Sequence, residues 1–248
     1  MAVNAASLLQ ASPGSLSGRR PSLAITVSLH ALPRPSMNFS TDRDLLAFDP
    51  AVFNELPFAT QQRLSVADAD LDGTTLTSPT ADFHAAGVDA GSVVLIATVP
   101  HEVLARIDAM ALIVSRLRSS TTDPAIPGTD GQNLSVVVRT LEPQAALVNA
   151  MLLRTLGIDV DDPSAELTEE SVLSLSLMAR LEALGTLQLA YAAAATVAGD
   201  NAGLRTKADQ FGVRFAKERL AASVLIDRNG DGLPDERRCF GTLRMQRV

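Results

Sequence analysis

The stretch TEESVLSLSLMARLEALGTLQLAYAAAATVAGDN (residues 168–201) decides the fold class of the C-terminal half of this chain. Thr168 is a favourable N-cap residue, and the two glutamates after it place negative charge in a first helical turn, where it is stabilising. Leu and Ala then dominate until Gly199 and Asn201, which are typical of a helix end and of the next N-cap. We therefore predict a helix from Thr168 to Ala198, about 30 residues and roughly 45 Å long.

Two further helices are predicted beside it, one on each side in the sequence. Pro143 suits the first turn of a helix that ends at Gly157, and Asn201 suits the cap of the last helix. Each carries an apolar face at helical spacing, which is Leu147, Met151, Leu152 and Leu156 in the first and Leu204, Ala208, Phe211 and Phe215 in the last. Residues 141–222 are thus expected to form a helical bundle.

The preceding region, residues 46–140, has a different pattern. Its short stretches are rich in β-branched residues and are separated by turn formers such as Gly73, Gly87 and Gly91. They read RLSVADA, TTLTS, SVVLIATV, VLARIDA, ALIVSRL and LSVVVRTL. This pattern predicts a small β-barrel or sandwich. The expected fold class is therefore α+β.

The two ends of the chain differ from both regions. Residues 1–45 are rich in Ser, Ala and Pro and are predicted to form an extended arm. Residues 223–248 are predicted to form a hairpin or extended tail, in which Cys239 is expected to be a small buried residue.

Composition limits the classes of function. The formal net charge of −7 argues against binding driven by neutralising nucleic-acid phosphates. Cys239 is the only cysteine, so an intramolecular disulfide and a Cys-based zinc site are excluded, which favours a reducing compartment. No apolar run reaches the roughly 18–20 residues needed to span a bilayer, and no secretory signal is recognised. We expect a protein that binds no membrane.

The segment DRNGDGLPDE (residues 227–236) resembles the start of a calcium loop. The candidate oxygen ligands are Asp227, Asn229, Asp231, the carbonyl of Leu233, and Asp235. Arg238 stands where an EF-hand needs a bidentate glutamate, so two ligands are missing. A hairpin turn explains the same residues, because Asn, Gly and Asp tolerate positive φ. No cofactor is required, and a structural calcium ion is the one candidate.

No catalytic motif is present in the sequence. HEVLA (residues 101–105) lacks the second histidine of a zinc protease motif, and the chain has no nucleophile elbow or phosphate-binding loop. His30, His84 and His101 are each expected in surface or turn positions. We expect no enzymatic activity; the alternative is a site assembled in space from distant residues.

The C-terminal segment is basic and half apolar. Residues 237–248 contain four arginines and no acid. Such a strand can dock into an acidic groove or onto the sheet edge of a partner, or it can be an ordinary edge strand with solvated arginines. The predicted partner-binding residues are Phe240, Leu243, Arg244, Met245, Arg247 and Val248.

Two parts of the sequence resemble virion proteins of tailed bacteriophages. LDGTTLTSPTADFHAAGVDAGSVVLI (residues 71–96) is similar to a phrase found in their small β-domains. LMARLEALGTLQLAYAAAATVAG (residues 177–199), then RFAKERLAAS, DRNGDGLPD and the basic tail, resembles head–tail connector (adaptor) proteins. The large β-domain and the N-terminal arm depart from the simplest adaptors.

The resemblance implies a structural protein of the virion neck, assembled in the host cytoplasm. Its subunits would form a homo-oligomeric ring that binds the portal and further neck or tail proteins, and double-stranded DNA would pass through the ring without sequence-specific binding. The acidic connector (residues 159–170) would line the channel with Asp159, Asp161, Asp162, Glu166, Glu169 and Glu170. The alternatives are a tail-completion or stopper protein and a calcium-dependent binding module using residues 227–236.

Overall fold

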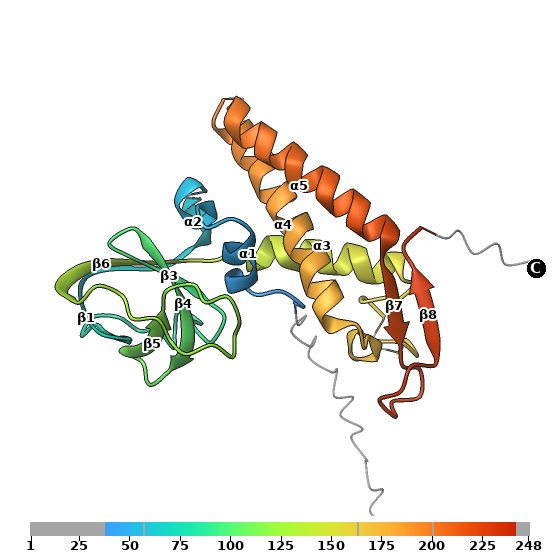
Figure 1. Cartoon of the computed structure of the whole chain (residues 1–248), viewed down its shortest axis with the longest axis horizontal. Helices are drawn as coiled ribbons and strands as arrows, with labels where there is room; N and C mark the ends of the chain where they lie inside the picture. The colour runs from blue at the N-terminus through green and yellow to red at the C-terminus, as the bar shows by residue number, and fades with distance from the viewer. Residues whose placement is uncertain (1–37, 57, 163, 200, 242–248) are drawn as a thin grey trace, which may run out of the picture. The chain divides into compact units, whose positions relative to one another are not determined.

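The computed structural model describes residues 38–241 except 57, 163 and 200. It shows an α+β chain with an antiparallel β-barrel, packed helices and a C-terminal hairpin, as Figure 1 illustrates. Most of the predicted N-terminal arm, and the tail from residue 242, lie outside the described residues.

The six β-rich stretches form six strands, which confirms the prediction of a β-domain and selects the barrel over the sandwich. All pairs are antiparallel, and pairing of the last strand with the first closes the barrel in the order β1-β2-β5-β4-β3-β6. The interior holds Leu76, Leu112, Val114 and Val136, all fully buried. The strands are β1 (Gln62–Asp72), β2 (Thr75–Thr77), β3 (Val93–Ile96), β4 (Val99–Arg106), β5 (Ala111–Ser115) and β6 (Gly131–Arg139).

Three longer helices follow the barrel: α3 (Glu142–Thr155), α4 (Leu175–Val197) and α5 (Ala202–Ala221). The side chain of Asn201 accepts hydrogen bonds from the first amides of α5, so the predicted cap is confirmed. The predicted apolar face of α5 packs on α4, where the rings of Phe211 and Tyr191 stack with centroids 5.8 Å apart.

The long helix begins later than predicted. Thr168 precedes only a short 3-10 turn, η2 (Glu169–Ser171), and α4 starts at Leu175. The reason is tertiary, because residues 171–173 pair with the C-terminal hairpin. The amide of Leu173 donates to the carbonyl of Leu225 at 2.9 Å, and the amide of Asp227 donates to the carbonyl of Ser171 at 2.8 Å. Pairing with a strand overrides the local capping signal.

The predicted apolar face of α3 is only half right. Leu152 and Leu156 are buried, but Leu147 is 65% exposed and Met151 is 38% exposed. The buried face includes Ala145 and Val148 instead, which share the helical core with α4.

The segment before the barrel contains helices that the sequence did not indicate. They are α1 (Asp42–Phe48), α2 (Val52–Glu55) and the 3-10 turn η1 (Ala59–Gln61). We call residues 38–56 the linking segment, because its buried side chains belong to the same core as strand β3 and helix α4. That core contains Leu45, Leu46, Val52 and Phe53 together with Val93 of β3 and Leu181 of α4.

The C-terminal hairpin consists of β7 (Ser223–Ile226) and β8 (Glu236–Cys239). Cys239 is exposed, so the prediction that it is buried is wrong. It lies on the outward side of β8, where exposed and half-buried residues alternate. Among the described helices, none is both long and apolar enough to cross a membrane.

Two helical glycines provide a matched test of this packing. A Cβ on Gly185 of α4 would lie 2.7 Å from Cγ1 of Val148 and 3.3 Å from the ring of Phe215, whereas on Gly212 of α5 it would meet only the flexible Gln188 side chain at 3.1 Å. We expect Gly185→Ala to lower the free energy of unfolding by about 1–3 kcal/mol through overpacking. Gly212→Ala should raise it by up to about 1 kcal/mol through helix propensity. Urea denaturation measures both, and equal effects would contradict the packing described here.

Candidate functional site

The predicted calcium loop joins β7 to β8 and is organised by its first residue. Asp227 is 6% exposed. Its Oδ1 accepts from the amides of Asn229 at 3.1 Å and Gly230 at 2.7 Å, and its Oδ2 accepts from the amide of Gly232 at 2.7 Å. The Gly232 amide contributes most, and together these hydrogen bonds lower the pKa of Asp227. The carboxylate therefore stabilises the turn.

The other candidate ligands also contact the backbone of their own loop. Asn229 Oδ1 accepts from the amide of Asp231 at 3.0 Å, and Asp231 Oδ1 accepts from that of Leu233 at 2.8 Å. Asp235 Oδ2 accepts from the amide of Arg228 at 2.8 Å. In the described part of the chain, no group of three or more His, Cys, Asp or Glu side chains is placed to hold a metal ion. The hairpin is confirmed, and calcium binding stays a prediction.

The acidic connector is partly neutralised by arginines of the same chain. Asp161 contacts Arg154 at 2.6 Å, and Glu166 contacts Arg228 at 3.0 Å. Glu169 is half-buried. The other three acids predicted to line a channel are exposed, namely Asp159, Asp162 and Glu170. The six acids therefore lie in one connecting segment. Their role in lining a channel stays a prediction.

The structure describes the basic tail only as far as Gly241. Phe240 packs against this chain's own helical core, and Arg238 contacts the carbonyl of Leu156 and the carboxylate of Glu236. These side chains stabilise the hairpin on the helices. The remaining predicted partner-binding residues lie outside the described residues: Leu243, Arg244, Met245, Arg247 and Val248.

The two histidines in the described region differ from each other. His84 lies exposed in a turn, as expected. His101 is only 2% exposed, in strand β4, so the expectation of a surface position is wrong for it. The loop before β6 covers its ring, because Gly128 packs so closely that a Cβ there would lie 2.8 Å from Nε2 of His101. His30 lies outside the described residues.

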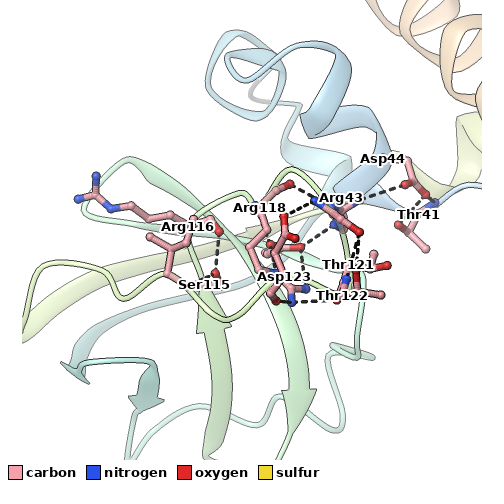
Figure 2. Close-up of polar contacts among 12 residues, drawn as sticks. Thr41, Arg43, Asp44, Ser115, Arg116, Arg118, Thr121, Thr122 and Asp123 are labelled. Atoms are coloured by element: carbon pink, nitrogen blue, oxygen red, sulfur yellow. Dashed lines mark hydrogen bonds and ion pairs between the residues drawn. The ribbon is translucent and has the colours of Figure 1, made fainter.

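Beside His101, the fully buried Glu102 is the centre of an ion cluster that the sequence did not reveal. Its carboxylate lies 2.6 Å from Nε of Arg43 and 2.7 Å from Nε of Arg118, and it also accepts the Arg118 amide at 2.9 Å. Arg118 donates further to the carbonyls of Thr121 at 3.0 Å and Asp123 at 2.7 Å. Figure 2 shows these arginines converging on one point of the barrel.

This cluster stabilises the fold. Burial by itself would raise the pKa of Glu102, but the hydrogen bonds from Arg118 and Arg43 outweigh it and lower the pKa. The carboxylate is therefore ionised, and both oxygens are occupied. It is poorly suited to act as a general base, because a base needs an oxygen free to accept a proton. No sequence spacing connects residues 43, 102 and 118.

A second cluster joins the linking segment to the helices. The hydroxyl of the fully buried Tyr191 lies 2.7 Å from Asp49 Oδ2 and 2.9 Å from Glu55 Oε2. Lys207 Nζ contacts the same two oxygens at 2.9 and 2.5 Å. Burial and the two carboxylates raise the pKa of Tyr191, so its phenol is neutral. The cluster binds α2 to α4 and α5.

A third cluster surrounds Glu182 of α4, which is fully buried. It accepts hydrogen bonds from the amide of Ser40 at 2.9 Å, its hydroxyl at 2.6 Å, and the amide of Phe39 at 3.1 Å. Asn149 Nδ2 of α3 donates at 3.0 Å. Burial raises the pKa of Glu182 despite these donors. All three clusters therefore include residues of the linking segment.

The chain was compared with known proteins at three levels. No protein-family model, no curated protein and no solved structure matches it. Similarity therefore shows no family for the chain.

The ion cluster predicts a large difference between two glutamates. Glu102→Gln leaves Arg43 and Arg118 without their buried counter-charge, which should lower the free energy of unfolding by about 3–5 kcal/mol. Glu142→Gln removes an exposed partner of Arg63 and should cost no more than about 1 kcal/mol. Chemical denaturation of both variants checks this. A cost for Glu102→Gln as small as that for Glu142→Gln would show that the cluster is not stabilising.

Asp42 predicts a pH dependence of stability. Burial raises its pKa from 3.8 to about 6, although the Leu141 amide donates to it at 2.9 Å. A raised pKa in the folded state means that the stabilisation is present below about pH 4 and is lost as the pH rises through 6. The free energy of unfolding of Asp42→Asn minus that of wild type should therefore rise by about 2–3 kcal/mol as the pH is raised from 4 to 7.

The control for this experiment is Asp209→Asn, which removes an exposed carboxylate from α5. Subtracting its effect leaves the contribution that burial makes at Asp42. Parallel stability curves for wild type and Asp42→Asn across this pH range would refute the raised pKa.

Proposed function

We propose that the chain is a non-catalytic structural subunit of a tailed-phage neck, in which a homo-oligomeric ring joins the portal to the tail. The observation that carries the proposal is apolar exposure on the helices. Seven large aliphatic side chains on α3, α4 and α5 are between 38% and 78% exposed: Leu147, Met151, Leu175, Leu189, Val197, Val213 and Leu220. Apolar surface of this kind is typical of protein–protein contact sites.

The positions of these side chains suit a ring. Leu147 and Met151 are four residues apart on α3 and so lie on one side of that helix, while Val213 and Leu220 are seven apart on α5. A closed ring needs heterologous contacts, in which one surface of a subunit meets a different surface of its neighbour. Separate apolar surfaces on α3 and α5 supply such a pair.

The buried clusters also favour a structural role. The carboxylates of Glu102 and Glu182 receive several donors each, and these donors come from segments far apart in the sequence. Such carboxylates stabilise the fold instead of meeting a substrate.

Portal docking is assigned to the tail beyond Gly241. Phe240 is occupied in this chain's own core, so docking would depend on Leu243, Arg244, Met245, Arg247 and Val248. The exposed acids of the connector, Asp159, Asp162 and Glu170, would face passing DNA and repel its phosphates. Both assignments follow the resemblance to connector proteins and are part of the proposal.

Quantitative mass spectrometry of assembled particles tests the function. We expect about one copy of this chain per portal subunit, because a connector ring stacks directly on the portal. A far higher ratio would move the protein to the tail or capsid surface. A ratio well below one would favour a tail-completion or stopper role, and absence from particles would refute a virion protein.

Two substitutions that each introduce a negative charge test individual residues in the same experiment. Leu147→Glu places a charge on the proposed ring contact and should remove the chain from particles. Gln132→Glu places the same charge at an exposed position of strand β6 and should leave the copy number unchanged. Circular dichroism confirms that both variants fold. Normal incorporation of Leu147→Glu would exclude α3 from the ring contact.

A further inference from the structure

Helix α3 presents four residues that follow the spacing of a coiled-coil seam. They lie four, three and four positions apart, which keeps them on one side of the helix. Leu147 is 65% exposed, Pro143 and Arg154 are exposed, and Ala150 is half-buried. The opposite side of α3 packs on α4. We call Pro143, Leu147, Ala150 and Arg154 the α3 seam.

Helix α5 presents a second set with the same spacing. Asp209, Val213, Ala216 and Leu220 also lie four, three and four positions apart. All four are exposed, and the two larger apolar side chains, Val213 and Leu220, are 69% and 67% exposed. The opposite side of α5, which includes Phe211, packs on α4 (Figure 1). We call these four exposed residues the α5 seam.

The two seams are complementary when the helices run antiparallel. Equal spacing brings all four positions into register, so that four layers form together. Each apolar layer then joins a larger side chain to a smaller one, as close packing requires, and the last layer joins a cation to an anion. The layers are Pro143 with Leu220, Leu147 with Ala216, Ala150 with Val213, and Arg154 with Asp209.

The parallel arrangement has the same register but unfavourable chemistry. It places Arg154 opposite Leu220 and Asp209 opposite Pro143, so both charges would lose water without gaining a partner. Such desolvation is costly, because no opposite charge compensates it. The charges therefore select the antiparallel direction.

Neither seam suits a second copy of itself. Two α5 seams leave Asp209 opposite another Asp209 or an apolar residue, and two α3 seams leave Arg154 without an acid in the same way. The favourable contact therefore joins different surfaces of two copies. This is the heterologous contact that a closed ring requires.

We propose that α3 of one copy packs antiparallel on α5 of the next copy, with Arg154 paired to Asp209 across the contact. This inference rests on the proposed ring and names the residues that build its contact. Arg154 already meets Asp161 of its own chain at 2.6 Å. Because a guanidinium has five N–H donors, Arg154 can keep this pair and still bind a second carboxylate. A contact of four layers is small, so we expect weak association of one pair and stronger association in a closed ring.

Charge reversal tests the pair in the purified full chain by sedimentation velocity. Arg154→Asp and Asp209→Arg each place like charges across the contact, so each should weaken self-association at least about tenfold. Asp72→Arg makes the same change at an exposed position of strand β1 and should leave association unchanged. Circular dichroism checks that every variant folds.

Mixing the two charge-reversed chains shows whether the residues meet. Every contact between unlike chains in the mixture joins opposite charges, so association should return to within about threefold of wild type. This recovery would support a contact between α3 and α5 of different copies. The proposal is overturned if wild type stays monomeric at roughly millimolar concentration, if Arg154→Asp alone associates normally, or if the mixture does not recover.

A volume exchange tests the direction of the helices. Leu147→Ala leaves a gap in one layer and Ala216→Leu overfills it, so each should weaken association by about tenfold. The variant with both changes again has one large and one small side chain in that layer and should associate like wild type. Additive losses in the double variant would exclude the antiparallel register.

The same variants separate this contact from the proposed function. If particles contain as many copies of the chain as of the portal subunit, but charge reversal changes neither association nor incorporation, the ring stands and this contact is refuted. If the mixture recovers as predicted but the chain is absent from particles, the contact stands and the neck assignment is refuted.

Discussion

Two buried acidic side chains, Glu102 in the barrel and Glu182 in α4, each take part of their hydrogen bonds from one short segment, residues 39–43. Arg43 neutralises Glu102, while Phe39 and Ser40 donate to Glu182. A carboxylate removed from water without such donors costs several kcal/mol, so neither site tolerates loss of this segment. The barrel and the helices are therefore connected through a few polar contacts as well as through the apolar core.

This dependence also explains the place of the linking segment in the core. Once Ser40 and Arg43 are fixed, α1 and α2 bring Leu45, Leu46 and Phe53 into the core shared by β3 and α4. Asp49 and Glu55 then meet Tyr191 and Lys207 beside α5, as described above. The segment is thus part of the folded unit, and its ionisable residues make stability depend on pH.

Glu102 and His101, neighbours in strand β4, have opposite hydrogen-bonding surroundings. Glu102 accepts hydrogen bonds from Arg43 and from the amide and guanidinium of Arg118, so both of its oxygens are occupied. The adjacent residue, His101, has one nitrogen satisfied within its own strand and the other buried without a hydrogen-bond partner. Neighbours in a β-strand point to opposite faces, so the two side chains meet different surroundings although they are adjacent in the sequence.

The sequence by itself determined the α+β class, the six strands, the cap at Asn201 and the turn at residues 227–235. These features depend on local patterns: alternation, helical spacing, capping residues and glycines with positive φ. The same local patterns indicated the candidate calcium ligands and the candidate partner-binding residues of the tail. Patterns that act over a few residues are readable without knowledge of the fold.

Only the tertiary structure decided which faces are buried and which charges meet. Leu147 and Met151 fit an apolar stripe, yet α3 packs through Ala145 and Val148 because α4 lies on that side. Thr168 has the chemistry of a helix cap, yet pairing with β7 delays α4 to Leu175. Arg43, Glu102 and Arg118 come together only when α1 packs beside strand β4 and the segment after β5. Contacts across such sequence distances leave no periodic signal along the chain.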